Sequence, residues 1–148
     1  MRGKNSTGDP PPLLDSNLLA YVFDEGNPEK REITRNLVEE CWKGEREYTV
    51  SVQNLSEFYV IVTEKVENAI PKDIAERFVR LVVEFDGWRV MSLHGGTVVR
   101  AIEIRREHGA HYWDSLIAAV MEENGVRSIL TENEEDFKKI PWLEVVNP

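Results

Sequence analysis

The sequence has a single cysteine, Cys41, in 148 residues. One thiol excludes an intrachain disulfide and the thiolate set of a structural zinc site. The three histidines, His94, His108 and His111, also lack the spacing of zinc ligands. No apolar run approaches the roughly 20 residues that cross a bilayer, and the first residues lack the apolar middle region of a secretion signal. We therefore expect a cytoplasmic protein without a membrane segment.

Basic residues are few. The chain has 18 Lys and Arg against 27 Asp and Glu, which gives a formal net charge of -9 at pH 7. This charge repels a polyanion at long range and argues against a broad electrostatic grip on nucleic acid. A nucleic-acid enzyme of this composition must act through a local site. Most of the acids fit an ordinary solubilising surface, so only acids at special positions need a functional explanation.

The length and the 41% hydrophobic content fit one globular core. Residues 1–10 are polar and end in a proline run, which predicts a disordered arm, and we expect a single domain over residues 11–148. Four strands are predicted, each followed by helical sequence: a short strand ending near Asp15, and strands at 47–52, 88–93 and 126–131. This alternation indicates an α/β fold of three layers, α/β/α, with a mainly parallel central sheet.

Three predicted helices carry expectations about their buried faces. In the helix after Pro28, the four-residue spacing of Ile33, Leu37 and Cys41 predicts the inward face. Residues 53–66 read as one helix that is apolar around most of its circumference. The inward residues predicted for the helix after Pro71 are Ile74, Phe78, Leu81, Val82 and Phe85.

Four acids stand where a ligand site is expected, because open parallel sheets bind ligands beyond the carboxyl ends of their strands. Asp15 ends the first strand, Glu57 lies early in the helix after the second, and Asp136 follows the loop after the fourth. Asp114 lies in the first turn of its own helix. For Glu57 and Asp114 a plainer interpretation stays open, since a helix start favours negative charge by about 0.3 to 1 kcal/mol.

Convergence of these acids would require a cation. Two carboxylates about 5 Å apart repel by roughly 3 kcal/mol at an effective dielectric constant near 20. Oxygen ligands suit hard divalent ions such as Mg²⁺ or Mn²⁺, which commonly act on phosphates. The pattern therefore favours metal-assisted hydrolysis of phosphodiesters, provided that the inferred topology brings the acids together.

Four short stretches carry a resemblance to a known family. They are LLDSN at the first strand, SVQNLSEFY around Glu57, YWDSLIAA around Asp114 and ILTENEEDF near the end. In this order and context they resemble PIN-domain nucleases, particularly VapC-type toxins of toxin-antitoxin pairs. The resemblance covers about residues 12–148. It implies a parallel sheet that gathers three or four acids around Mg²⁺ or Mn²⁺, where an activated water cleaves RNA.

The resemblance assigns catalytic and metal-binding roles to acids of this chain. Asp15, Glu57 and Asp114 match the family pattern directly. For the fourth position the family pattern offers Asn133 and Asp136, of which Asp136 is favoured. Asn133 can still supply a neutral carbonyl oxygen or orient a bound water.

Neighbouring polar residues have supporting roles in this interpretation. Thr131 and Ser16 are expected to donate hydrogen bonds to the carboxylates, with simple turn capping as the alternative. Asn17 is expected to contact phosphate or hold the loop. Glu132 is expected to be a solvated loop acid.

The implied protein is an RNA endonuclease, a hydrolase of phosphodiesters, that acts as the toxin of a type II pair. The family also implies a homodimer and a cognate antitoxin whose basic side chains reach the acidic site. Two alternatives stay open: an inactive PIN-like scaffold that binds RNA or protein, and a PIN nuclease of RNA maturation. Whether one or two metal ions act is undetermined. Arg100, Arg105 and Arg106 share one helix, where pairing with acids such as Glu103 is favoured over RNA contact.

Overall fold

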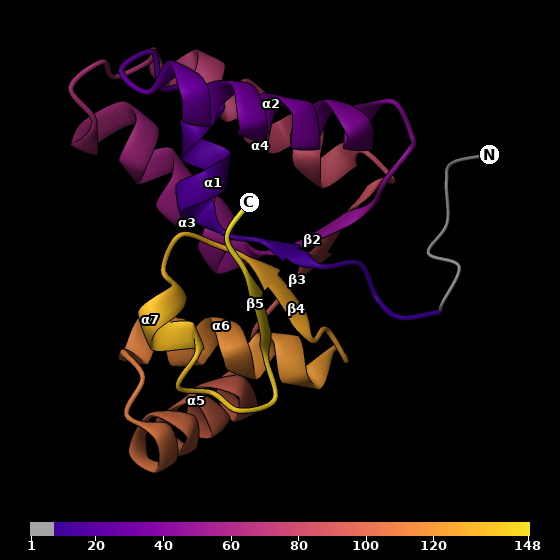
Figure 1. Ribbon diagram of the computed structural model, residues 1–148, viewed down its shortest axis with the longest axis vertical. Helices are drawn as coiled ribbons and strands as arrows, with labels where there is room; N and C mark the ends of the chain where they lie inside the picture. Colours follow the sequence, from indigo (N-terminus) through magenta and orange to yellow (C-terminus); the bar gives the residue numbers. More distant parts are fainter. Residues whose placement is uncertain (1–7) are drawn as a thin grey trace.

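A five-stranded sheet forms the middle layer of the computed structural model, which describes residues 8–148 (Figure 1). All pairings are parallel, and the strand order is β3-β2-β1-β4-β5. The strands are β1 (Leu13–Leu14), β2 (Tyr48–Ser51), β3 (Trp88–Met91), β4 (Ser128–Leu130) and β5 (Glu144–Val146). Residues 8–12 precede β1 without helix or strand. Residues 1–7 of the predicted arm lie outside the described residues.

Helices cover both faces of the sheet. Figure 1 shows α1 to α4 on one side and α5 to α7 on the other, as the predicted three-layer architecture requires. On the first side lie α1 (Ser16–Tyr21), α2 (Pro28–Trp42), α3 (Val52–Val60), the π-helix η1 (Ile61–Lys65) and α4 (Lys72–Glu84). On the second side lie α5 (Gly95–His108), α6 (Tyr112–Glu123) and α7 (Glu134–Phe137). The predicted fold class is confirmed.

The two faces of the sheet have separate apolar cores. Aromatic rings dominate the first core, where Phe78 packs against Phe23, Phe58 and Trp42 with ring centroids 5.0 to 6.3 Å apart. The second core is built around α6, in which every residue from 115 to 121 is buried. A helix so fully buried must be sandwiched between layers. It lies between the sheet and α5, and this placement fixes the position of its first turn.

Two of the predicted helix faces are confirmed only in part: Cys41, Phe78 and Val82 are buried as predicted, whereas Ile33, Ile74 and Leu81 are exposed. Ile33 is 38% exposed, and the residues that α2 buries are Thr34, Val38 and Cys41. Thr34 tolerates burial because its hydroxyl donates to Lys30 O at 2.9 Å. The pattern of apolar residues does not predict this face, because threonine is not an apolar residue.

In α4 the predicted residues Phe78 and Val82 are buried, but Ile74 is 39% and Leu81 is 50% exposed. Ala75, a small residue that lets the helix approach its neighbours, takes the inward position instead. The predicted helix over residues 53–66 is divided between α3 and η1. None of the helices in the described part of the chain is long and apolar enough to cross a membrane.

Candidate active site

Asp15 lies at the carboxyl end of the central strand and caps the N-terminus of α1. Its side chain is almost fully buried, with 4% exposed. Oδ1 accepts hydrogen bonds from Ser16 N at 2.8 Å and Asn54 Nδ2 at 3.1 Å, and Oδ2 accepts one from Thr131 Oγ1 at 2.7 Å. Burial raises the pKa of Asp15, while the Thr131 and Ser16 hydrogen bonds oppose the rise. A buried carboxylate is thus held in one orientation by three donors.

Glu57 reaches the same region from the second turn of α3. Its Oε1 accepts a hydrogen bond from Ser16 Oγ at 3.0 Å, and its Oε2 accepts one from Gln53 Nε2 at 3.1 Å. Gln53 also donates to the backbone oxygen of Trp113 at 3.0 Å, so it links α3 to α6. The Glu57 charge contributes to the raised pKa of Asp15. The two carboxylates therefore lie within electrostatic range, with the Ser16 hydroxyl within reach of both, 3.0 Å from Glu57 Oε1 and 3.4 Å from Asp15 Oδ1.

Asp114 extends from the first turn of α6 on the other side of the sheet. Asn133 Nδ2 donates to its Oδ2 at 2.7 Å. Burial, together with the negative charges of Asp15 and Asp136, raises the pKa of Asp114 to about 6, against the opposing effect of the Asn133 hydrogen bond. The N-terminus of a helix favours the charged form of an acid, but for Asp114 this effect is smaller than the effects that raise its pKa. Asp114 is thus a partly buried carboxylate that also experiences the charges of two neighbouring acids.

One cavity of about 470 Å³ connects these side chains. Its walls hold three of the four predicted acids together with polar and apolar residues from both sides of the site. They are Asp15, Ser16, Asn17, Ser56, Glu57, Val60, Ile61, Lys65, Asp114 and Asn133. The cavity opens beyond the carboxyl ends of β1 and β2, where an open parallel sheet places its ligands.

Asp136 lies outside this cavity wall. Its Oδ1 accepts a hydrogen bond from His111 N at 3.3 Å, and Lys139 Nζ lies 3.2 Å away. Its charge still raises the pKa of Asp114, so it lies close behind the site. Of the two residues that the family pattern offers for the fourth position, Asn133 faces the cavity and Asp136 does not.

The expectation that Glu132 is a solvated loop acid is wrong. Tyr21 OH donates to its Oε1 at 2.6 Å, and Lys30 Nζ lies 2.5 Å from its Oε2. Burial raises the pKa of Glu132, but the hydrogen bonds from Lys30 and Tyr21 lower it more. The contact fastens the loop of residues 131–133 to α1 and α2. Sequence alone cannot reveal it, because its partners are more than 100 residues apart.

The supporting residues occupy the loop edges of the site. Ser16 and Thr131 make the hydrogen bonds to carboxylates described above. Thr131 Oγ1 also accepts from Asn133 N at 2.9 Å and from Asn17 Nδ2 at 3.4 Å. It therefore joins the end of β4 to the start of α1. Asn17 holds the loop through this bond, and its place in the cavity wall is also compatible with a phosphate contact.

Asn54 is a site residue that the sequence analysis does not select. It forms a capping box with Ser51: Asn54 N donates to Ser51 Oγ at 3.1 Å, and Asn54 Oδ1 accepts from Ser51 N at 2.9 Å. The side-chain nitrogen of Asn54, Nδ2, is not used in the capping box and donates to Asp15 Oδ1. The spacing of Ser51 and Asn54 is a helix-start signal that sequence analysis can detect.

Arg100 and Arg105 of α5 make contacts away from the cavity. Arg100 Nε lies 2.7 Å from Glu122 Oε1, and its Nη1 lies 3.4 Å from Glu103 Oε1. Arg105 donates to Ala110 O at 2.9 Å. These two arginines therefore pair with acids or backbone oxygens and do not form a free basic surface.

The donor chemistry of the cavity fits a hard divalent cation. Its polar wall offers carboxylate, amide and hydroxyl oxygens, without sulfur or imidazole. Within residues 8–148, however, no three His, Cys, Asp or Glu side chains already form a closed ligand group. Neutral donors occupy oxygens of these carboxylates instead: Ser16 and Gln53 donate to Glu57, and Asn133 donates to Asp114. Such a site suits an ion that keeps several of its waters.

The parallel sheet of five strands, with acids gathered at its carboxyl edge, defines a PIN-like α/β protein. The sequence of residues 13–143 matches the family described as PIN domain, and the chain belongs to that family. No curated protein matches the sequence significantly.

Solved structures share the fold at low sequence identity. A toxin-antitoxin complex from Klebsiella pneumoniae is 21% identical with a TM-score of 0.63, over 93% of this chain and 97% of that chain. Mycobacterium tuberculosis VapC20, a sarcin-ricin loop cleaving toxin, is 14% identical with a TM-score of 0.67, over 90% and 97%. VapBC2 from Rickettsia felis, bound to a promoter DNA fragment, is 17% identical with a TM-score of 0.61, over 91% and 96%. These likenesses show the fold.

Proposed function

We propose that this protein is an endoribonuclease that depends on Mg²⁺ or Mn²⁺ and hydrolyses RNA phosphodiesters. The observation that carries the proposal is the meeting of Asp15, Glu57 and Asp114 around one cavity at the carboxyl edge of the sheet. Membership of the PIN domain family, in which nuclease activity is typical, supports it. Such a cluster of acids does not help to stabilise the folded core, because like charges at short range repel one another.

Asp15 and Asp114 are the proposed metal ligands, with Glu57 as the third acid. Burial raises the pKa values of both aspartates, and the charge of a neighbouring acid adds to each rise, Glu57 for Asp15 and Asp15 for Asp114; a cation would offset this cost. When bound, a divalent ion lowers the pKa of water and neutralises charge on a phosphate. Asn133 takes the fourth position in this proposal because it lines the cavity. Asp136 does not line the cavity and affects Asp114 through its negative charge.

The surrounding side chains prepare the carboxylates for this role. Thr131, Asn54 and Ser16 fix both oxygens of Asp15, so the carboxylate is already oriented. Gln53 holds Glu57 from the same helix. The pKa of Asp114, raised to about 6 in the metal-free protein, would fall again beside a bound cation, which favours the charged carboxylate. In the proposal, one of these carboxylates takes the proton of the attacking water.

Cleavage of RNA by variants tests the proposal. The wild type is expected to cut structured RNA with Mg²⁺ or Mn²⁺ and to stop when a chelator is added. Asp15→Asn and Asp114→Asn each should lose about 100-fold or more of the rate, whereas Asp73→Asn should keep it. Asp73 is a matched control because it is an exposed acid in the first turn of α4. Cutting that survives chelation, or survives both site variants, contradicts the proposal, and RNA binding without cutting favours an inactive scaffold.

The proposed biological setting is a type II toxin-antitoxin pair in which this chain is the toxin and acts as a homodimer. Toxin-antitoxin complexes among the similar structures support this setting. The antitoxin's basic side chains would compensate the acidic cavity. Addition of a cognate antitoxin should abolish cleavage. Full activity in a stable complex at saturating antitoxin would leave a nuclease of RNA maturation as the better description.

A further inference from the structure

The helix that carries Glu57 changes its winding before it ends. After α3, residues 61–65 form the π-helix η1, in which Val66 N donates to Ile61 O at 3.2 Å, five residues back. Thr63 helps to disturb the regular winding, because its hydroxyl donates to Tyr59 O at 2.6 Å. A π-turn contains one more residue than an α-turn, and such turns are frequent at functional sites.

The π-helical segment contributes a charged side chain to the cavity wall. In a helix, the face of Glu57 recurs at Ile61, four residues on, and then at Glu64 and Lys65, seven and eight residues on. In the structure Ile61 lines the cavity, and of the two charged residues Lys65 lines it and Glu64 does not. The segment that contains the π-turn therefore presents its lysine, and not its acid, to the cavity.

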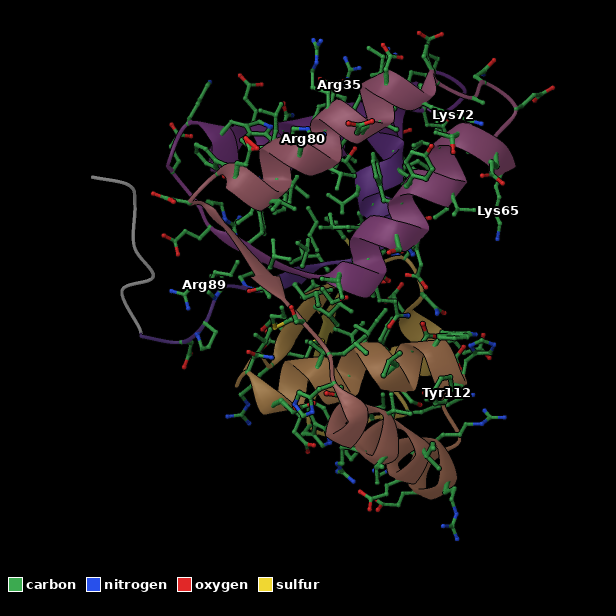
Figure 2. All side chains as sticks on the ribbon, turned by 180° about the vertical axis from the view of Figure 1, so that it is seen from behind. Arg35, Lys65, Lys72, Arg80, Arg89 and Tyr112 are labelled. Carbon is green, nitrogen blue, oxygen red and sulfur yellow. The ribbon has the colours of Figure 1, made fainter. Side chains whose placement is uncertain are left out.

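Lys65 is the cationic side chain of a wall that otherwise carries Asp15, Glu57 and Asp114. Within the described residues, no hydrogen bond or ion pair joins Lys65 to another side chain or backbone group. The nearby carboxylates are instead engaged by neutral donors such as Gln53. Figure 2 shows Lys65 at the end of this helical segment, on the same side of the view as Tyr112, where α6 begins. Lys65 is exposed and can meet a ligand at the cavity mouth.

We propose that Lys65 binds a phosphate of the RNA strand that enters the cavity. This inference rests on the proposed function and adds a substrate contact to it. An acidic cavity repels a phosphate chain, and a lysine at its rim supplies a positive charge at the point of entry. A phosphate contact of this kind carries no sequence preference, so Lys65 contributes affinity and register rather than choice of base.

Binding of a fluorescent single-stranded RNA, followed by anisotropy across a KCl series, tests the role of Lys65. The series is run in EDTA, where no metal-dependent cutting occurs, and repeated with Ca²⁺. Lys65→Ala should raise the Kd about fivefold near 100 mM salt and reduce the salt slope by about 0.7, the value for one phosphate contact on a single strand. Lys65→Glu should weaken binding further, and Lys65→Arg should restore it.

Lys72→Ala is the matched control. Lys72 is also an exposed lysine on the same side of the sheet, at the start of α4, but it does not line the cavity. Figure 2 shows it well separated from Lys65. Equal changes of Kd and salt slope in the two alanine variants overturn the proposal, as does a wild type that binds no RNA in either buffer. RNA binding that depends on Lys65, in a protein that never cuts with Mg²⁺ or Mn²⁺, upholds the contact and rejects the nuclease.

Discussion

Asp114→Asn should stabilise the metal-free protein at neutral pH, although it removes a proposed metal ligand. Burial, with the charges of Asp15 and Asp136, raises the pKa of Asp114 from 3.8 to about 6 in the folded protein. Between these values the folded state keeps a proton that the unfolded state has released, so the free energy of unfolding falls as the pH rises. The penalty is complete above about pH 6 and is absent well below pH 4.

The size of this effect follows from the same values. A pKa difference of one unit corresponds to about 1.4 kcal/mol, so the rise from 3.8 to about 6 gives at most about 3 kcal/mol at pH 7.5. Asp114 is only partly buried, and solvent reduces the gain to about 1 to 2 kcal/mol. For a chain of this length, Tm should rise by about 3 to 8 °C. An asparagine keeps an oxygen for the hydrogen bond from Asn133.

Urea and thermal unfolding in EDTA, at pH 4 and pH 7.5, measure this gain. Asp73→Asn serves as the control, because it also removes an acid from the first turn of a helix, where the macrodipole favours the charge by about 0.3 to 1 kcal/mol. We expect stabilisation by Asp114→Asn at pH 7.5, most of it lost at pH 4, and a small loss of stability for Asp73→Asn at pH 7.5. Equal effects of Asp114→Asn at the two pH values would refute the assigned cause.

Three further changes probe the surroundings of the site. Thr131→Val removes the hydroxyl that donates to the buried carboxylate after β1, and should lower the free energy of urea unfolding by about 1 to 3 kcal/mol. Tyr21→Phe removes one of the two contacts that hold Glu132, and should cost about 0.5 to 1.5 kcal/mol in the same assay. Asp136→Asn removes a nearby negative charge and should lower the pKa of Asp114, measured by carboxyl NMR titration, while metal affinity persists.

The fold was predictable because its signals are local. Alternation of apolar strands with helical sequence indicates a parallel sheet, and the turn at Asn124 and Gly125 marks the end of α6. The faces of α2 and α4 were not predictable to the residue. Their inward positions are occupied by Thr34 and Ala75, which apolar periodicity does not select.

The acids of the cavity were predictable from their positions after strands and in helix starts. Their partners were not, because Asn54, Gln53 and the contact between Tyr21 and Glu132 are set by tertiary packing. The π-helical turn that contains Lys65 was not predicted either, because the sequence pattern there is that of a continuous helix.

Calorimetric titration of Mn²⁺ into the protein tests the central claim most directly, namely that the gathered carboxylates hold a divalent ion. We predict saturable binding to the wild type and to Asp73→Asn, and a loss of affinity of about tenfold or more in Asp15→Asn and in Asp114→Asn. Equal affinity in all four proteins, or no binding to the wild type, contradicts the account.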